Sequence, residues 1–237
     1  MIEYGPLIHR FGHLDGRALL EPMLGHVFPG KLAVVSSFGA ESAVLLHMAA
    51  GIDRSVPVVF LETGKLFAET LAYRDHLVSY FGLVNVCSVA PDTEELALSD
   101  PDGTLHAANP DGCCHVRKVA PLERALAGLQ AWVTGRKRFQ GGARSHLPTL
   151  EAAEWRLKIN PLARWSRDDL ENYMGAHDLP RHPLEAQGFA SIGCAPCTLP
   201  PGPGGGLRDG RWAGTDKTEC GIHWTVNGRP ARAASGS

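Results

Sequence analysis

The cysteines are the residues whose type and spacing point most directly to chemistry. Of the six, Cys113 and Cys114 are adjacent, and Cys194 and Cys197 form a CxxC pair in a stretch rich in glycine and proline. Four thiolates in two pairs can hold a structural zinc ion or an iron–sulfur cluster. Neighbouring residues of a helix diverge by about 100°, so adjacent cysteines suit a wide group such as a [4Fe–4S] cluster better than one ion. The spacing favours the cluster and keeps zinc as the alternative.

A fifth cysteine has the surroundings of a nucleophile. Cys220 lies in the polar segment KTECGIHW, with Lys217 and His223 three residues to either side. Nearby cations lower the pKa of a thiol and enrich the nucleophilic thiolate. Cys87, in contrast, lies in the middle of the apolar run LVNVCSV and is predicted to pack in the core. Cys220 is therefore the candidate nucleophile.

Two cations follow the adjacent cysteines at helical spacing. Arg117 lies four residues after Cys113, and Lys118 four residues after Cys114, so each would share the helix face of its cysteine. A four-thiolate cluster is anionic, and these side chains would offset its charge. The alternative is an ordinary solvated pair on the helix surface.

The segment SSFGAES, residues 36–42, is a candidate anion-binding loop. It follows the apolar run KLAVVS and precedes AVLLHMAA, the place of a phosphate-binding loop in an α/β protein. It has no lysine and a single glycine, so it does not match the GxxxxGK[ST] template of nucleoside triphosphate loops. On its residues alone, an anion loop and a plain strand-to-helix turn are equally good interpretations.

The elements that must position these residues alternate along the chain. Strands are predicted at 31–36, 56–61, 83–89, 131–135 and 155–163. Helices are predicted at 43–50, at 66–81, at 113–128 with a bend or restart at Pro121, and at 166–180 with Ser166 as its cap. Short joins between such elements predict an α/β fold, a mostly parallel twisted sheet with helices on both faces. The loops SSFGAES and ETGK then fall at the carboxyl ends of the strands, where ligands bind.

The composition and the glycine- and proline-rich tract indicate the class of protein and its domain organisation. With 44% apolar residues and a formal net charge of -2, the chain gives no reason to expect nucleic acid or anionic membrane as a partner. It has no apolar run of about 20 residues and no signal-peptide layout, so we expect a cytoplasmic protein. One α/β domain is predicted at 1–198. The tract TLPPGPGGG opens a flexible linker and mobile tail at 199–237, which carries Cys220.

Taken together, five segments resemble a known family. SSFGAES, FLETGKLFAET, CCHVRK, GCAPC and TECGIH are similar to the assimilatory adenylyl-sulfate reductases, the iron–sulfur branch of the phosphoadenylyl-sulfate reductase family. The resemblance implies an adenine-nucleotide α-hydrolase-like fold related to the PP-loop proteins. It also implies reduction of adenosine 5′-phosphosulfate to sulfite and AMP, with thioredoxin or a glutaredoxin-like protein as donor, and a possible homo-oligomer.

The resemblance further implies which residues act. One [4Fe–4S] cluster per chain would be bound by Cys113, Cys114, Cys194 and Cys197. The catalytic residues would be Cys220, His223 and Lys118. The substrate-binding residues would be Ser36, Ser37, Phe38, Gly39, Ser42, Glu62, Thr63, Gly135, Arg144, Arg208 and Arg211. The segment GGARSHLP departs from the RxxQS-like pattern of many relatives, which leaves the roles of Arg136, Arg138 and Gln140 open.

This interpretation predicts a two-step reaction. Cys220 would attack the sulfonyl sulfur, expel AMP and become an S-sulfonate. With four cysteines on the cluster and Cys87 in the core, an outside dithiol must then release sulfite. The flexible linker would let the tail close over the nucleotide and then swing out to the donor.

Three alternatives stay open. The first is reduction of the 3′-phosphorylated nucleotide, alone or as a second substrate. The second is an ATP-dependent adenylating or thiolating enzyme of the same fold, disfavoured because no SGGxDS-type loop is present and Glu41 stands where an Asp is expected. The third is a zinc-stabilised binding module, which leaves TECGIHW unexplained.

Overall fold

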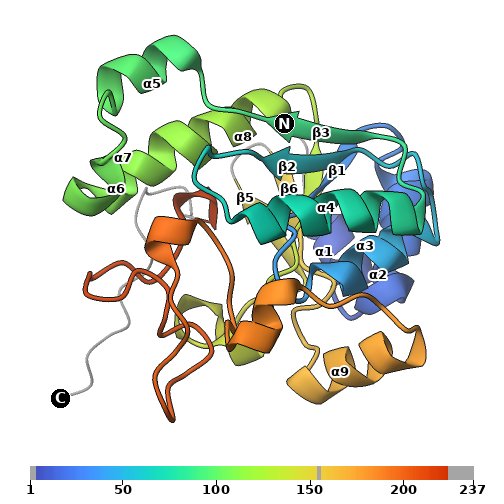
Figure 1. Cartoon of the computed structure of the whole chain (residues 1–237). Coiled ribbons are helices and arrows are strands. Elements are labelled where there is room, and N and C mark those ends of the chain that lie inside the picture. The colour runs from blue at the N-terminus through green and yellow to red at the C-terminus, as the bar shows by residue number, and fades with distance from the viewer. Residues whose placement is uncertain (1–3, 154–155, 224–237) are drawn as a thin grey trace, which may run out of the picture.

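The centre of the molecule is a six-stranded sheet with the order β3-β2-β1-β4-β6-β5 (Figure 1). The computed structural model describes residues 4–153 and 156–223. The strands are β1 (Leu32–Val35), β2 (Val58–Leu61), β3 (Val86–Val89), β4 (Ala131–Val133), β5 (Leu150–Ala153) and β6 (Arg156–Ile159). All neighbouring strands run parallel except β5, which is antiparallel to β6. The predicted mostly parallel sheet is confirmed.

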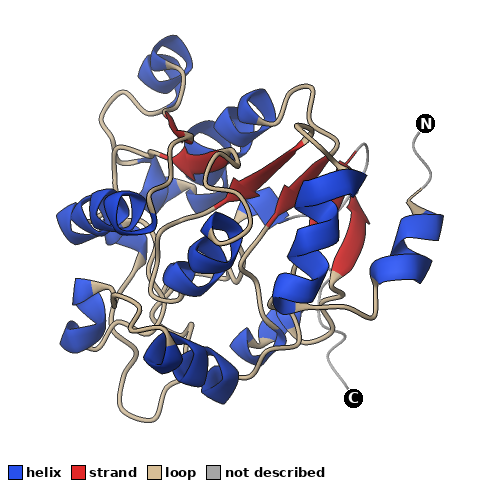
Figure 2. Cartoon of the chain, turned by 90° about the vertical axis from the view of Figure 1, so that its right-hand side faces the viewer, coloured by secondary structure: helices blue, strands red, loops and turns tan. Residues whose placement is uncertain are grey.

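Helices cover both faces of this sheet (Figure 2). The α-helices are α1 (Gly5–Phe11), α2 (Gly16–Pro22), α3 (Ser42–Ala50), α4 (Ala68–Phe81), α5 (Thr93–Ser99), α6 (Leu105–Ala108), α7 (Pro110–Cys114), α8 (Ala120–Ala125) and α9 (Arg167–Ala176). Alternate residues of β1 serve opposite faces, as the period of two of a strand requires. Val34 packs in the larger core with α3 and α4, whereas Val35 packs in a smaller core with Leu122 of α8.

The strand order reverses direction in the middle of the sheet. From β1 the chain proceeds outward to β2 and β3, and it then returns to β4 on the other side of β1. At such a switch point the loops that leave the two strands diverge, which opens a crevice at their carboxyl ends. Here those loops are 36–41 after β1 and 134–137 after β4.

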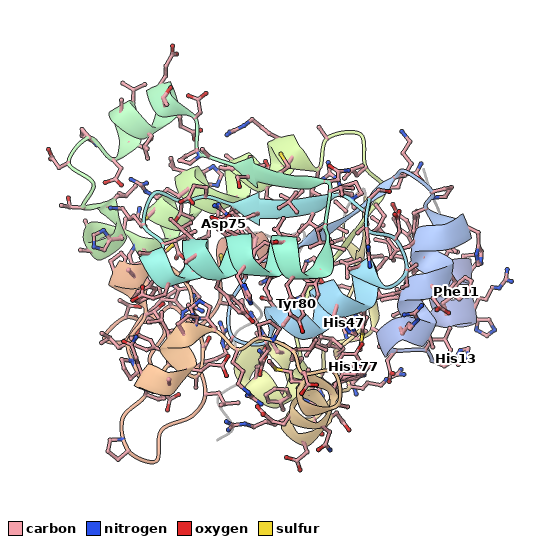
Figure 3. The ribbon with its side chains drawn as sticks, turned by 45° about the vertical axis from the view of Figure 1, so that its right-hand side comes forward. Phe11, His13, His47, Asp75, Tyr80 and His177 are labelled. Carbon is pink, nitrogen blue, oxygen red and sulfur yellow. The ribbon has the colours of Figure 1, made fainter. Side chains whose placement is uncertain are left out.

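Most predicted elements are present, with shorter boundaries. The helix predicted at 66–81 is α4. The helix predicted at 166–180 is α9, whose Ser166 cap accepts a hydrogen bond from the Asp169 amide at 3.1 Å. The strand predicted at 155–163 is β6, and the antiparallel strand β5 beside it was not predicted. Helix α9 packs on α3 through Tyr173, whose hydroxyl lies 2.9 Å from His47, and His177 lies close to His47 in Figure 3.

The predicted core position of Cys87 is wrong. Strand β3 is one of the two edge strands of the sheet, and Cys87 is exposed on it. An apolar run does not distinguish an edge strand from a central one, because hydrophobicity alone does not tell how many neighbours a strand has.

The helix that carries Cys113 and Cys114 is interrupted, as predicted, but a π-helical turn that was not predicted precedes Pro121. Helix α7 ends at Cys114, a π-helical turn spans His115–Val119, and α8 begins with Pro121 in its first turn. A wider turn changes the direction in which the following side chains project. Arg117 and Lys118 lie within that turn and point to different surroundings, described below.

The tail segment folds back onto the domain. Leu199 donates its amide to the Gly210 carbonyl at 2.8 Å, and Thr198 pairs with Arg211 in a short antiparallel bridge. Trp212 and Cys220 are buried. No helix in the described ranges is both long and apolar enough to cross a membrane.

Candidate active site

A cleft of about 190 Å³ opens at the switch point of the sheet. Its lining comes from the loop after β1, the loop after β4, the π-helical turn and the tail. The predicted residues that line it are Ser36, Ser37, Gly39, Ser42, Lys118, Gly135, Arg144, Arg208, Arg211, Cys220 and His223. Ser36 and His223, which are 187 positions apart in the sequence, thus line the same cleft.

Three predicted substrate-binding residues do not line this cleft. Phe38 is fully buried in the core, where its ring packs edge-on against Phe60 with centroids 5.3 Å apart. The Glu62 carboxylate accepts a hydrogen bond from the Gly64 amide at 3.0 Å. The Thr63 hydroxyl lies 3.3 Å from the Cys194 sulfur, on the cysteine side of the loop. Their side chains shape the supporting loops.

A second, small cavity is lined by the two cysteine pairs. Cys113, Cys114, Cys194 and Cys197 all face it, together with the cationic side chains Lys65, Arg117, Lys118 and Arg211. Four soft sulfur ligands surrounded by cations match the needs of an anionic iron–sulfur cluster. The chemistry of this donor set, four thiols with cations around them, therefore fits such a cluster.

Arg117 has a structural partner on the cysteine side. Its guanidinium donates to the Asp100 carboxylate at 2.6 Å and to the Thr63 carbonyl at 2.6 Å, and the pair is buried. The solvated alternative for Arg117 is therefore wrong. The ion pair ties the π-helical turn to the loop after β2 and to the segment before α6.

The cleft and the cysteine cavity share a wall. Lys118, Arg211 and Trp212 line both of them. Cys220 of the cleft packs in one cluster with Cys114 and Trp212. The candidate nucleophile thus lies directly against the candidate cluster ligands, which the sequence distance of 106 residues between Cys114 and Cys220 does not reveal.

The surroundings of Cys220 favour its thiolate. Its thiol is 8% exposed. A hydrogen bond with Cys114 and, against the effect of burial, the ammonium of Lys118 lower the pKa of Cys220 to about 5. A thiolate is the reactive form of cysteine, so these surroundings suit the candidate nucleophile.

Two cationic side chains of the cleft, Lys118 and Arg211, have hydrogen-bond donors that are not paired with a carboxylate of the described residues. Lys118 forms no ion pair with any carboxylate in the described part of the chain. Arg211 donates through Nη1 to the Ser191 hydroxyl at 3.2 Å, but its buried Nε has no partner among the described residues. Buried donors of native proteins are nearly always paired, so an unpaired donor on a residue that lines the cleft indicates a candidate anion-binding position.

Arg144 and Arg208 are already paired. The Glu219 carboxylate accepts hydrogen bonds from Nε and Nη2 of Arg144 at 2.5 and 2.7 Å, and from Arg208 at 3.2 Å. Burial would raise the pKa of Glu219, but the hydrogen bonds and charge of Arg144 lower it to about 2. Sequence reasoning missed Glu219, because its partner Arg144 lies 75 residues away.

Of the three residues whose roles were open, Arg136 and Gln140 line the cleft, whereas Arg138 is exposed and does not line it. Arg136 donates to Glu151 at 2.9 Å, and Glu151 also accepts a hydrogen bond from Lys158 at 3.1 Å. Gln140 donates to Glu41 at 3.1 Å, and Arg138 donates to the Leu147 carbonyl at 2.8 Å. These contacts account for the three side chains without a ligand.

His223 enters the cleft above Trp132. The two rings are parallel within 2° with centroids 6.0 Å apart. Burial, followed by the charges of Arg136 and Arg144, lowers the pKa of His223 well below its usual value, so the imidazole is neutral. Its Nδ1 is buried and has no partner among the described residues, which leaves one hydrogen-bonding position for a ligand.

The fold and the cleft define a nucleotide-binding α/β domain with a cysteine at its ligand site. Residues 31–200 match the family model of the phosphoadenosine phosphosulfate reductase domain, and the chain belongs to that family. It is 55% identical over 213 residues to the adenosine 5′-phosphosulfate reductase of Mesorhizobium japonicum, covering 90% of this chain and 84% of that protein. It is 51% identical to the protein of the same name from a Chelativorans species, covering 94% and 91%.

Solved structures support the fold. The phosphoadenylyl-sulfate reductase of Candida auris superposes with a TM-score of 0.69 at 24% identity, covering 84% of this chain and 99% of that one. The FMN adenylyltransferase of Candida glabrata gives a TM-score of 0.57 at 15% identity, covering 84% and 67%. The expected fold is confirmed, since both solved structures share it.

Proposed function

We propose that this protein reduces adenosine 5′-phosphosulfate to sulfite and AMP with electrons from a dithiol protein of the thioredoxin type. The relatives at 55% and 51% identity carry the name of that activity. The observation that carries the proposal is the meeting of Cys220 with Lys118 and Arg211 in one cleft at the sheet switch point, where nucleotides bind in folds of this kind.

The anionic end of the nucleotide binds beside Cys220. The sulfate and phosphate oxygens pair with Lys118 and with the unpaired Nε of Arg211, since guanidinium and ammonium groups are the usual ligands of such oxygens. Ser36, Ser37 and Ser42 supply hydroxyl groups along the loop after β1. The loop that lacks a triphosphate lysine thus holds a smaller anion, whose counter-charges come from the π-helical turn and the tail.

The first step is a displacement at sulfur. The Cys220 thiolate attacks the sulfonyl sulfur, the bond between that sulfur and the phosphate oxygen breaks, and AMP leaves with the electron pair. The product is a Cys220 S-sulfonate. Lys118 stabilises the charge that moves onto the departing oxygen, and the neutral His223 offers a hydrogen bond to the reacting group.

The second step releases sulfite. A thiolate of the donor protein attacks the sulfur atom of Cys220, sulfite departs with the electron pair, and a mixed disulfide forms. The second thiol of the donor then resolves it, which returns Cys220 and leaves the donor oxidised. An outside donor is needed although Cys87 is exposed, because Cys87 lies on the edge strand β3 and does not line the cleft.

The four-cysteine site is proposed to hold one [4Fe–4S] cluster. Cys113, Cys114, Cys194 and Cys197 would bind it, and Arg117 and Lys118 lie where they offset its charge. When bound, the cluster supplies a rigid anionic group beside Lys118. The thiol exchange already accounts for both electrons of the reaction.

The division of the chain follows from this chemistry. Residues 1–198 form the nucleotide-binding domain, and 199–237 form the linker and tail that carry Cys220 in and out of the cleft. Arg208, Arg211 and Cys220 of the tail line the cleft and Cys220 is buried, an arrangement that we assign to the closed state of the tail. We place the reaction in the cytoplasm, where free thiols and reduced donor proteins persist.

The deciding experiment replaces the nucleophile. Cys220→Ser is expected to lower release of AMP and sulfite by more than about a thousandfold, because a hydroxyl is a far weaker nucleophile than a thiolate. Cys87→Ser is the matched control and should keep wild-type rates. Release of both products by Cys220→Ser at the wild-type rate would exclude the mechanism. Running each assay with the 3′-phosphorylated nucleotide as well separates the two substrate classes.

A further inference from the structure

The buried carboxylate next to the nucleophile is not explained by the reaction. Glu219 is 6% exposed and lies on the wall of the cleft, yet it would repel an anionic substrate. Its Oε1 also accepts the backbone amide of Cys220 at 2.9 Å. The position of Glu219 is therefore coupled directly to that of the nucleophile.

The contacts of Glu219 reach two different parts of the chain. Arg208 belongs to the same tail segment, so its 3.2 Å contact is internal to the tail. Arg144 belongs to the loop region after β4, on the domain, and it holds both carboxylate oxygens of Glu219 at 2.5 and 2.7 Å. The Arg144–Glu219 pair thus joins the tail to the domain at the residue that precedes Cys220.

We propose that Arg144 and Glu219 form a latch that holds the catalytic tail closed, and that Glu219 is a positioning residue for Cys220. Arg144 then serves the tail, whereas Lys118 and Arg211 serve the substrate. The latch deepens the proposed function and rests on it only in naming Cys220 as the nucleophile. A two-point pair between a planar guanidinium and a carboxylate fixes direction as well as distance, which is what a positioning contact requires.

The latch is itself anchored to the loop after β1. Arg144 donates through Nη1 to the Gln140 side chain, and Gln140 donates to Glu41 at 3.1 Å. Glu41 also accepts a hydrogen bond from Lys137 at 2.5 Å. A chain of hydrogen bonds therefore runs from the tail, along the cleft floor, to the loop that meets the ligand.

The test measures how readily Cys220 is reached from solvent. Holoprotein purified without oxygen is treated with iodoacetamide, and peptide mapping gives the alkylation rates of Cys220 and of exposed Cys87 in the same sample. Rates are compared at the pH plateau of each thiol, so that ionisation does not enter the ratio. Glu219→Gln and Arg144→Gln should each raise the ratio of Cys220 to Cys87 by about tenfold or more, since each removes a charge-assisted contact.

The double variant Arg144→Gln with Glu219→Gln removes both buried charges and should be no faster than the faster single variant, because the same contact is lost. Glu151→Gln is the matched control. It removes a partly buried carboxylate that pairs with Arg136 and Lys158 and makes no hydrogen bond to the described residues of the tail, so the ratio should stay at the wild-type value.

An unchanged ratio in both Glu219→Gln and the double variant overturns the latch. An equal rise in Glu151→Gln also overturns it, since the effect would then be a general loosening of the cleft. The alkylation assay needs no substrate, so its outcome is independent of whether the wild-type protein reduces adenosine 5′-phosphosulfate.

Discussion

At the scale of single residues, the pairing of each cation decides its role in the cleft. Arginines 144 and 208 satisfy Glu219, and Arg136 satisfies Glu151. Lys118 has no carboxylate partner within the described ranges, and Arg211 keeps a buried donor unused. A guanidinium already paired with a buried carboxylate attracts a second anion less strongly, because the first partner offsets its charge.

Lys118 is therefore expected to carry most of the transition-state stabilisation. Lys118→Met should lower kcat/KM by about a hundredfold, since one positioned charge at the departing oxygen contributes roughly 2.7–4 kcal/mol. Steady-state kinetics measure this, with iron content checked alongside. Arg124→Gln is the control, because Arg124 of α8 is exposed and, within residues 4–153 and 156–223, its side chain donates a hydrogen bond only to the Ala90 carbonyl. If kcat/KM of Lys118→Met fell by less than about threefold, a residue other than Lys118 would stabilise the charge on the departing oxygen.

At the scale of elements, short irregular segments orient the site, while the regular ones support it. The π-helical turn His115–Val119 sends Arg117 to Asp100 and Lys118 to the cleft. The turn Pro183–Gln187 leads into the CxxC loop and is capped by His182. The imidazole of His182 accepts the Leu184 amide and meets the Thr70 hydroxyl of α4, both at 3.1 Å.

This buried cap predicts a pH-dependent stability. Burial lowers the pKa of His182 to about 4 from its ordinary 6.5, so the unfolded chain binds the proton more readily than the folded one. The contribution is complete above pH 6.5 and is lost as pH falls toward 4. Between about pH 7.5 and pH 5, the free energy of unfolding of the wild type should fall by about 2 kcal/mol more than that of His182→Gln.

Urea titrations followed by tryptophan fluorescence measure this difference. The exposed His26 provides the control, and His26→Gln should keep the wild-type pH dependence. Parallel pH dependences of the wild type and His182→Gln would show that His182 does not titrate in this window.

At the scale of the whole molecule, two cavities meet at one wall. The cleft lies at the switch point between β1 and β4, and the cysteine cavity lies behind Lys118, Arg211 and Trp212. A cluster bound in the cysteine cavity would join α7 to the CxxC loop, beside the wall that the cavity shares with the cleft. Loss of the proposed cluster should therefore disturb the substrate site even when no residue that lines this site is mutated.

Iron analysis tests this arrangement. Protein purified without oxygen should contain about four iron atoms and four acid-labile sulfides per chain. Cys197→Ser should lose most of both, whereas Cys87→Ser, which changes an exposed thiol of the edge strand, should keep them. If the wild-type protein contained zinc and no sulfide, the cluster proposal would be wrong and the four cysteines would form a structural zinc site.

Local patterns determined much of this protein. Apolar runs and helical spacing predicted the sheet and helix α4, since these depend on neighbours in sequence. The paired cysteines, Cys220 and most of the cleft residues were also predictable, because a family resemblance is carried by short motifs. The placement of Cys87 was not, since edge and central strands share the same local pattern.

Only the tertiary structure decided which charges meet. Arg144 and Glu219 are 75 residues apart, and nothing local tells that they pair. The same holds for the contact of Cys220 with Cys114 and for the direction of Lys118 out of the π-helical turn. The strength and partners of a buried charge depend on the groups that folding brings within a few ångströms, which the chain order does not encode locally. For this reason the motifs predicted the candidate residues, and only the fold decided which of them lie in the cleft, in the cysteine cavity or against each other.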